Sequence, residues 1–318
     1  MAEAGGTAFH TVGWARHKCH GASGEPLYCI WRDPESGQEA GRALAIRRPP
    51  RVSRMGRLAS KLTFDSPPTA RAPGSDFVAP LEAWARRQPA LIEVKLGSLD
   101  QRSQWGPEPV PNPHPRREYV IVLDGDEDVW GGMNRASRRN VKRATAAGLE
   151  TRPGTVADLE LFAGLYRSTL ERLDAQKGVG FRLDDAGFRD SLSPLLEDGL
   201  GHLYLTGSEG TIEAGWIFIG FGDGAYSVYS GTTDSGRAAD AGSLVLFDAL
   251  CDMRQRGFAR LNLGGADWSA PDPESPDHGL HVYKTRLGAV PQECFGGTLA
   301  LRPWRARLVG SARRVLGR

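Results

Sequence analysis

The order of apolar and polar positions along the chain predicts a mixture of helices and strands. In the first third, short apolar runs occur at residues 27–31 and 43–46, and a helix is expected at 76–87 before a strand at 91–96. Residues 118–123 (EYVIVL) then form a β-branched apolar run that is typical of a buried strand. The first part of the chain therefore predicts a small α/β unit, and a second unit begins near this strand.

Helical periodicity is clearer after this strand. One helix is expected from Asp126 to Ala147, because acids lie at its start and Lys142 and Arg143 lie near its end, where the helix dipole favours them. Thr155 is expected to cap a second helix. Its apolar residues recur every three or four positions: Leu159, Phe162, Leu165, Tyr166, Leu170 and Leu173.

The remaining pattern predicts an antiparallel series followed by alternating helices and strands. A tight turn at Gly222-Asp223-Gly224 separates two of the expected strands. The expected elements are a helix at 184–196, strands at 202–206, 211–221 and 225–230, a helix over 244–253, a strand at 259–263, a short helix holding Tyr283 and Lys284, a strand at 294–300 and a basic helix from Pro303. This order is that of an acyltransferase-type α+β domain.

Five prolines within residues 105–115 block both a helix and a central strand, and they mark a domain boundary. A chain of 318 residues is long enough for about two domains. We therefore expect a first domain at residues 1–116, a second at 117–301, and a C-terminal helix at 302–318 that packs back on the first domain.

Composition is that of a globular protein, with 40 basic and 38 acidic residues and 40% hydrophobic residues. No apolar run approaches the roughly 18 residues of a membrane-spanning helix, and the first ten residues lack the pattern of a signal peptide, so a cytoplasmic location is expected. Four cysteines form no CxxC pair. The spacing of His10, His17, Cys19, His20 and Cys29 matches no usual zinc module, and no metal is expected.

Basic residues gather in three segments, at 42–57, 135–143 and 302–318. Such patches on a nearly neutral protein indicate a local anionic partner, such as the phosphates of tRNA or of a nucleotide- or lipid-linked acceptor, although each can also be a solvated face. Phosphate contacts of this kind carry no sequence specificity. The last segment either touches an anionic membrane surface or packs its apolar stripe against the first domain.

Four motifs follow one another in the second half: RRNVKRA at 138–144, YSGTTD at 229–234, LGG at 263–265 and GLHVYKTRLG at 279–288. In series they resemble the Fem family, the aminoacyl-tRNA-dependent transferases that build peptidoglycan cross-bridges, together with relatives that form amide bonds on natural products. The resemblance covers about residues 118–300. It implies an α+β fold of two GNAT-like acyltransferase domains, each with a mixed or antiparallel sheet flanked by helices.

The resemblance also implies catalytic residues. Lys284 would stabilise the negative charge that grows on an ester carbonyl oxygen when an amine attacks it, a role that a cation in a dry cleft can fill. The alternative for Lys284 is a surface lysine that caps a helix. Tyr283 is either a packing residue or a hydroxyl in the cleft, and Tyr229 lies where an acyltransferase fold opens between strands. In a regular strand, Tyr226 and Tyr229 would face opposite sides, so at most one would reach the site.

Further residues are candidates for binding substrate. Arg286 suits a phosphate or an acid of the preceding loop, and Thr232 offers a hydroxyl at the end of a strand. Asp234 either orients the attacking ammonium or caps the next helix. His281 either serves as a general base or bonds the acidic loop at 267–277.

The donor depends on residues 237–243 (RAADAGS). In an acyltransferase that uses coenzyme A, glycines at this helix start let backbone amides hold the pyrophosphate. Here Arg237 is a candidate for binding substrate, but Asp240 follows it and would repel a phosphate, which weakens the acyl-CoA interpretation. Phosphates of tRNA would instead meet the basic helix, at Arg138, Arg139, Lys142 and Arg143. In the family a cation of the first domain helps to hold the acceptor, for which Lys61 and Arg57 are the candidates.

The sequence therefore predicts an aminoacyltransferase that moves an amino acid from aminoacyl-tRNA to an amine of a peptidoglycan precursor or a natural product. The tRNA is a co-substrate, and neither a cofactor nor DNA is expected. One alternative is a GNAT-type N-acyltransferase that uses acyl-CoA or an acyl-carrier protein. The other is a non-catalytic RNA- or nucleotide-binding module that uses the basic patches alone.

Overall fold

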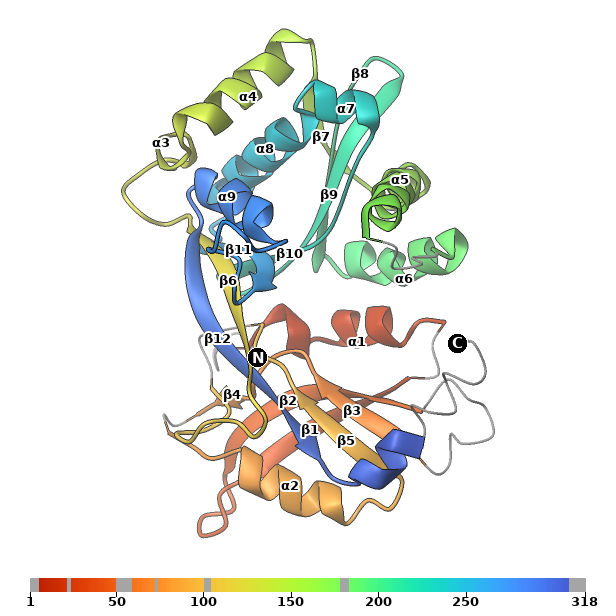
Figure 1. Cartoon of the computed structure of the whole chain (residues 1–318), viewed down its shortest axis with the longest axis vertical. Helices are drawn as coiled ribbons and strands as arrows, with labels where there is room; N and C mark the ends of the chain where they lie inside the picture. Colours follow the sequence, from red (N-terminus) through yellow and green to blue (C-terminus); the bar gives the residue numbers. More distant parts are fainter. Residues whose placement is uncertain are drawn as a thin grey trace. The chain divides into compact units, whose positions relative to one another are not determined.

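The computed structural model shows two compact units (Figure 1). Unit 1 contains residues 1–116 and 293–318, and unit 2 contains residues 117–292. The structure describes residues 6–21, 24–49, 59–71, 74–99, 104–177 and 183–308. The expected division differs at one place, because residues 293–301 belong to unit 1 rather than to the second domain. Their strand pairs with a strand of unit 1, with Thr298 opposite Lys95.

Unit 1 is a mixed sheet with helices. Its sheet order is β1-β2-β3-β5-β12, with β4 paired to β2, and only β3 and β5 run parallel. Its core holds Trp31, Phe64, Phe77 and Trp105. The elements are η2 (Ala8–His10), α1 (Val12–Cys19), β1 (Glu25–Arg32), β2 (Glu39–Arg48), β3 (Ser60–Phe64), β4 (Thr69–Ala70), α2 (Val78–Arg86), β5 (Leu91–Leu96) and β12 (Val290–Ala300), whose first three residues lie in unit 2.

The predicted basic helix begins at residue 303 and is described as far as residue 308. It lies against the first domain, as expected, because Arg302 donates to the carbonyl of Leu91 (2.5 Å) and Arg305 donates to that of Pro89 (2.7 Å). Ala306 packs against the buried Ile92. Residues 309–318, which carry the rest of the predicted helix, lie outside the described residues.

Unit 2 has the sheet order β6-β11-β10-β9-β8-β7. Its elements are β6 (His114–Val122, whose first three residues lie in unit 1), α3 (Val129–Gly132), α4 (Arg135–Ala146), β7 (Glu150–Gly154), η4 (Val156–Asp158), α5 (Leu159–Lys177), α6 (Asp185–Glu197), β8 (Gly201–Ser208), β9 (Thr211–Phe221), β10 (Gly224–Thr232), α7 (Asp234–Ala238), α8 (Ala241–Gln255), β11 (Arg260–Asp267) and α9 (His278–Arg286). Both units are thus mixed sheets with flanking helices, and the predicted α+β class is confirmed.

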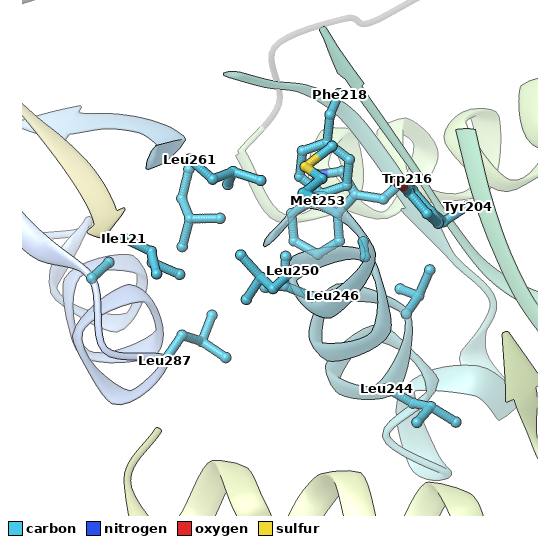
Figure 2. Close-up of a cluster of buried hydrophobic side chains, with 14 of the residues drawn as sticks. Ile121, Tyr204, Trp216, Phe218, Leu244, Leu246, Leu250, Met253, Leu261 and Leu287 are labelled. Atoms are coloured by element: carbon cyan, nitrogen blue, oxygen red, sulfur yellow. The ribbon is translucent and has the colours of Figure 1, made fainter. Parts of the chain in front are cut away.

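Strand β9 shows how side-chain alternation builds the two faces of this sheet. Trp216 and Phe218 point into a buried cluster with Leu250 and Met253 of α8 (Figure 2). The alternate positions of the strand face α5, because a side chain at Gly215 would meet Phe162 within 3 Å. Helices therefore cover both faces, and the sheet strands are buried between them.

The helix expected from Asp126 to Ala147 is two helices. Asp128 caps α3 by accepting a hydrogen bond from the amide of Gly131, and Asn134 caps α4 by accepting one from the amide of Ser137. Between them Met133 has an extended backbone, and its side chain is almost completely buried. Asp128 and Asn134 thus each cap the start of a separate helix, whereas the sequence pattern predicted a single helix over this segment.

Strands β10 and β11 run parallel only at the beginning. Among the described residues their pairing ends where Tyr226 lies opposite Asn262, although both strands continue beyond it. The antiparallel pairing of β10 with β9 has a bulge between Ser227 and Tyr229. Two neighbouring strands that separate in this way leave an opening in the sheet at residues 227–232 and 263–267.

Within the described ranges, no helix is both long enough and apolar enough to cross a bilayer.

Candidate active site

Lys284 is buried in unit 2, beside the point where β10 and β11 separate. Its side chain lies on α9 and the residue is 5% exposed. Its Nζ donates to the carbonyls of Gly264 (2.7 Å) and Gly265 (3.0 Å). It also lies 5.0 Å from the centre of the Tyr119 ring, a cation–π contact. The alternative of a surface lysine capping its own helix is therefore wrong.

The backbone of β11 explains why two consecutive carbonyls face this ammonium. Gly264 has a φ of +80°, a backbone conformation that residues other than glycine rarely adopt. Asn262 holds this turn, because its Oδ1 accepts a hydrogen bond from the amide of Gly264 (2.7 Å). The LGG motif therefore supplies a local change of strand direction next to Lys284.

A tyrosine and a histidine lie beside the lysine. The hydroxyl of Tyr119 lies 2.9 Å from Nδ1 of His281. Burial raises the pKa of Tyr119, and burial together with electrostatic repulsion from His278 and Arg117 lowers the pKa of His281. The lowered pKa favours the neutral imidazole, and the hydrogen-bond partner of the His281 ring is Tyr119 rather than an acid of the loop at 267–277.

A buried carboxylate completes this group. Glu118 of β6 is fully buried, and its Oε2 accepts a hydrogen bond from the hydroxyl of Tyr226 on β10 (2.8 Å). A carbon atom added at the Cβ position of Gly264 would lie 3.9 Å from the Tyr226 hydroxyl and 3.9 Å from Nζ of Lys284, with no other atom closer. The two polar groups thus converge on a small space above Gly264.

A cavity of about 350 Å³ adjoins α9. Tyr283 and Arg286 line it from α9, Asn140 lines it from α4, and Ser243 lines it from the first turn of α8. The carbonyl of Arg286 accepts hydrogen bonds from the amide of Asn134 (2.9 Å) and the hydroxyl of Ser137 (3.1 Å), which join the end of α9 to the start of α4. The RRNVKRA and GLHVYKTRLG motifs are therefore two walls of one cavity.

The cations of α4 lie beside this cavity in different environments. Arg139 and Lys142 are exposed, and Arg138 is half-buried. Nζ of Lys142 lies 5.6 Å from the centre of the Trp130 ring, and Arg143 forms an ion pair with Asp240. Arg138 and Arg139 have no ion-pair partner in the described part of the chain, so their charges are available to an anionic ligand.

Asp240 occupies the start of α8. It has a φ of +58°, and its carbonyl accepts from the amide of Ser243 (2.9 Å). Its pairing with Arg143 neutralises the carboxylate, but the side chain still stands at the helix terminus where an acyl-CoA pyrophosphate would bind backbone amides. In the structure, as in the sequence, the carboxylate of Asp240 at the start of α8 disfavours binding of acyl-CoA.

The bulge in β10 corrects the expected orientation of the two tyrosines. Tyr226 lies opposite Ile219 and Tyr229 lies opposite Ile217, and residues two apart on a strand share a face. The extra residue thus brings Tyr226 and Tyr229 to the same side of the sheet. Tyr229 packs edge-on against Tyr166 of α5 (5.3 Å between ring centres), within a small aromatic cluster.

The other candidates from the YSGTTD motif organise the chain between β10 and α8. Thr233, not Asp234, caps α7, because its Oγ1 accepts from the amide of Gly236 (2.9 Å). Asp234 is paired with Arg237 at 2.6 Å, so each neutralises the other on the surface. The amide of Thr232 donates to Thr169 (3.1 Å). Thr232 stands close to the start of α8, with its Oγ1 3.7 Å from a Cβ position at Gly242.

The first-domain candidates lie in unit 1. Lys61 is paired with Glu93 at 2.8 Å, and Arg57 lies outside the described residues, as do residues 50–58 of the basic segment. No group of three or more histidine, cysteine, aspartate or glutamate side chains in the described ranges could hold a metal ion.

Sequence reasoning missed Glu118 and Tyr119 as site residues. A signal was present, because Glu118 begins an otherwise apolar run, and a buried carboxylate is costly unless a donor or cation meets it. Asn140, Ser137 and Ser243 gave no such signal, since small polar residues on helices are common on any surface.

Comparison with known proteins agrees with this architecture. Residues 133–284 match the family model described as an acetyltransferase (GNAT) domain, a range that includes α4, the separated strands and Lys284. The structure of FemX superposes on the chain with a TM-score of 0.69 at 14% identity, and the match covers 94% of each chain. The fold of the chain is therefore similar to that of FemX, and its residues 133–284 match the acetyltransferase (GNAT) domain model.

Other solved structures share the fold of this chain. The C-terminal domain of a putative lysylphosphatidylglycerol synthetase from Agrobacterium fabrum gives a TM-score of 0.52 at 14% identity, covering 89% of each chain. The L-PGS of Bacillus licheniformis gives 0.50 at 11% identity, covering 96% of this chain and 95% of that one. No curated protein sequence matches the chain. The residues that match the acetyltransferase (GNAT) model, 133–284, all lie within unit 2.

Proposed function

We propose that this protein is an aminoacyltransferase that moves an amino acid from aminoacyl-tRNA to an amine of a peptidoglycan precursor or a natural product. The observation that carries the proposal is the buried ammonium of Lys284 at the opening between β10 and β11. The resemblance of the fold to FemX and to the L-PGS structure supports the same class of reaction.

Lys284 suits the chemistry of amide formation from an ester. When an amine attacks the ester carbonyl, negative charge develops on the carbonyl oxygen, and the ribose hydroxyl then leaves. A fixed cation in a site that excludes water stabilises this charge more than it stabilises the neutral ester, and so it lowers the barrier. The carbonyls of Gly264 and Gly265 and the Tyr119 ring hold Nζ in place for this role.

The surroundings of the cavity favour tRNA as the donor. Arg138, Arg139 and Lys142 provide positive charge on α4, and the cavity between α4, α8 and α9 has room for part of a nucleotide. Contacts of these side chains to tRNA phosphates would be sensitive to salt. Asp240 at the start of α8 disfavours a pyrophosphate there, which argues against coenzyme A.

A second candidate is N-acyl transfer from acyl-CoA or from an acyl-carrier protein. It is favoured by the match of residues 133–284 to an acetyltransferase model. Coenzyme A would then raise the melting temperature of the protein through binding to the folded state.

Mass spectrometry of two parallel reactions separates these donors. Purified protein is incubated with cell-wall precursors and either a total pool of charged tRNA or acetyl-CoA. A mass gain of one amino-acid residue, abolished by RNase, supports the proposal and names the amino acid. An acetyl gain supports the second candidate. Salt-dependent tRNA binding without any product contradicts both and supports a non-catalytic binding module.

Replacing Lys284 tests its role directly. Lys284→Met keeps most of the side-chain volume but removes the ammonium, and kcat should fall by about 10²–10³-fold, as when one oxyanion donor is removed. Lys95→Met, at an exposed position of β5 in unit 1, is the matched control and should keep wild-type kcat. A folded Lys284→Met variant with wild-type turnover would contradict the mechanism.

A further inference from the structure

We propose that Tyr226 and Glu118 form a proton relay beside Lys284. Tyr226 accepts a proton from the attacking amine and passes its own hydroxyl proton to Glu118. This inference rests on the proposed function and deepens it, because it assigns a base for amide formation other than His281, whose ring is bonded to Tyr119.

The strand order places these two residues for a joint role. Strands β6 and β10 lie on either side of β11, and the Tyr226 hydroxyl reaches Glu118 Oε2 at 2.8 Å. The hydrogen bond between β10 and β6 therefore spans β11 near its LGG motif, where Gly264 and Gly265 have no side chains. Because Gly264 has no Cβ, a substrate group can enter the space that lies 3.9 Å from both the tyrosine hydroxyl and the lysine Nζ.

The polarity of the hydrogen bond determines the direction of proton transfer. The Tyr226 hydroxyl donates to Glu118, and a hydroxyl oxygen that donates in this way also has lone pairs with which it can accept from an N–H of the incoming amine. Tyr226 donates a hydrogen bond to the fully buried Glu118, and Nζ of Lys284 lies at the same distance as the Tyr226 hydroxyl, 3.9 Å, from the Cβ position of Gly264. The site therefore holds one base and one cation at the same small opening.

The step balances in atoms and protons. The amine nitrogen forms a bond to the ester carbonyl carbon, one N–H proton moves to the Tyr226 oxygen, and the tyrosine proton moves to Glu118. The tetrahedral oxyanion forms near Lys284. When the intermediate collapses, the bond to the ribose oxygen breaks, and that oxygen takes back one proton through the same two residues. Glu118 ends ionised, and the products are an amide and a free ribose hydroxyl.

The effects of other titratable groups near Tyr226 and Glu118 have to be distinguished from the effect of the relay. Nζ of Lys284 lies 5.0 Å from the centre of the Tyr119 ring, and the Tyr119 hydroxyl is bonded to His281 at 2.9 Å. Asp277 and Arg117 act electrostatically on Tyr119. A loss of activity alone would not distinguish them, so the test uses the pH profile of kcat and the number of protons that move in the transition state.

The experiment compares Tyr226→Phe and Glu118→Gln with wild type, using whichever donor the mass-spectrometric assay identifies. Tyr204→Phe is the matched control, since that hydroxyl also donates to a carboxylate, Asp252, at 2.5 Å in the same unit but belongs to the α8 core. We expect kcat to fall by about 10²–10³-fold in the first two variants, the usual contribution of a general base. We also expect Glu118→Gln to abolish the acidic limb of the kcat profile.

A proton inventory in mixtures of H₂O and D₂O provides the second measurement. Wild type should show two protons in transfer, and Tyr226→Phe should show one. The inference is overturned if both variants keep kcat within about threefold of wild type. It is also overturned if they lose activity with an unchanged pH profile and inventory, because that result indicates only a structural role. If the wild-type enzyme forms no product with any donor, the proposed function itself is overturned. The wild-type reaction thus distinguishes failure of the proposed function from failure of the relay.

Discussion

Replacing Gly264 by alanine tests whether the space between Lys284 and Tyr226 is where the reaction takes place. The substitution has two separable effects. Alanine at a φ of +80° is strained by about 1–2 kcal/mol, which should lower the melting temperature by about 2–8 °C for a unit of this size. The added methyl group also fills the space 3.9 Å from the hydroxyl and from Nζ.

Gly257→Ala is the matched control, because Gly257 has a φ of +87° and no atom within 4 Å of its Cβ position. Both variants should lose similar stability in thermal unfolding. Only Gly264→Ala should lose activity, by about 10²–10³-fold in kcat/KM, because the carbonyl oxygen can no longer approach the lysine. Equal activity in the two alanine variants would refute the placement of the ester above Gly264.

Three further predictions follow from other parts of unit 2. Phe218→Ala should lower the free energy of unfolding by about 3–5 kcal/mol in urea titration, because the ring is fully buried in the α8 core; a change under 1 kcal/mol would contradict this. The hydrogen bond from Arg152 lowers the pKa of Asp158 to about 2, below its unfolded value. This carboxylate therefore stabilises the fold above about pH 4 and loses that contribution between about pH 4 and 2. In acid titration Asp158→Asn should remove up to about 1 kcal/mol of pH dependence, since the arginine is half exposed. Arg139→Glu should weaken tRNA binding and reduce its salt dependence by about one phosphate contact, and an unchanged salt slope in filter binding would exclude this contact.

The sequence predicted most elements of unit 2 because their periodicity was local. The hairpin strands, the turn at 222–224 and the capped helix after Thr155 all depend on neighbours within a few residues. Strand β7 was missed because it is short and contains Pro153, and β3 was missed because only two of its five residues, Leu62 and Phe64, are apolar. The place of residues 293–301 depends on a pairing with β5, about 200 positions earlier in the chain.

The candidate site was only partly predictable for the same reason. Lys284 was found through a motif, but its acceptors at Gly264 and Gly265 depend on where the folded chain brings β11. The shared face of Tyr226 and Tyr229 depends on one bulge, which no side chain in the sequence announces. Glu118 was visible as a misplaced acid, but its partner could be named only once β6 and β10 were known to flank β11.

The division of unit 1 into two sequence segments has a consequence for synthesis on the ribosome. Unit 2 is one continuous stretch, so it can fold as soon as residue 292 has emerged. Unit 1 cannot, because β5 is without its β12 neighbour until residues 293–300 have been translated. At about 5–20 residues per second the interval from β5 to β12 lasts on the order of 10–40 seconds. During that time the apolar edge of β5 is open to pairing with other chains, and a chaperone that protects it would be most useful in this interval.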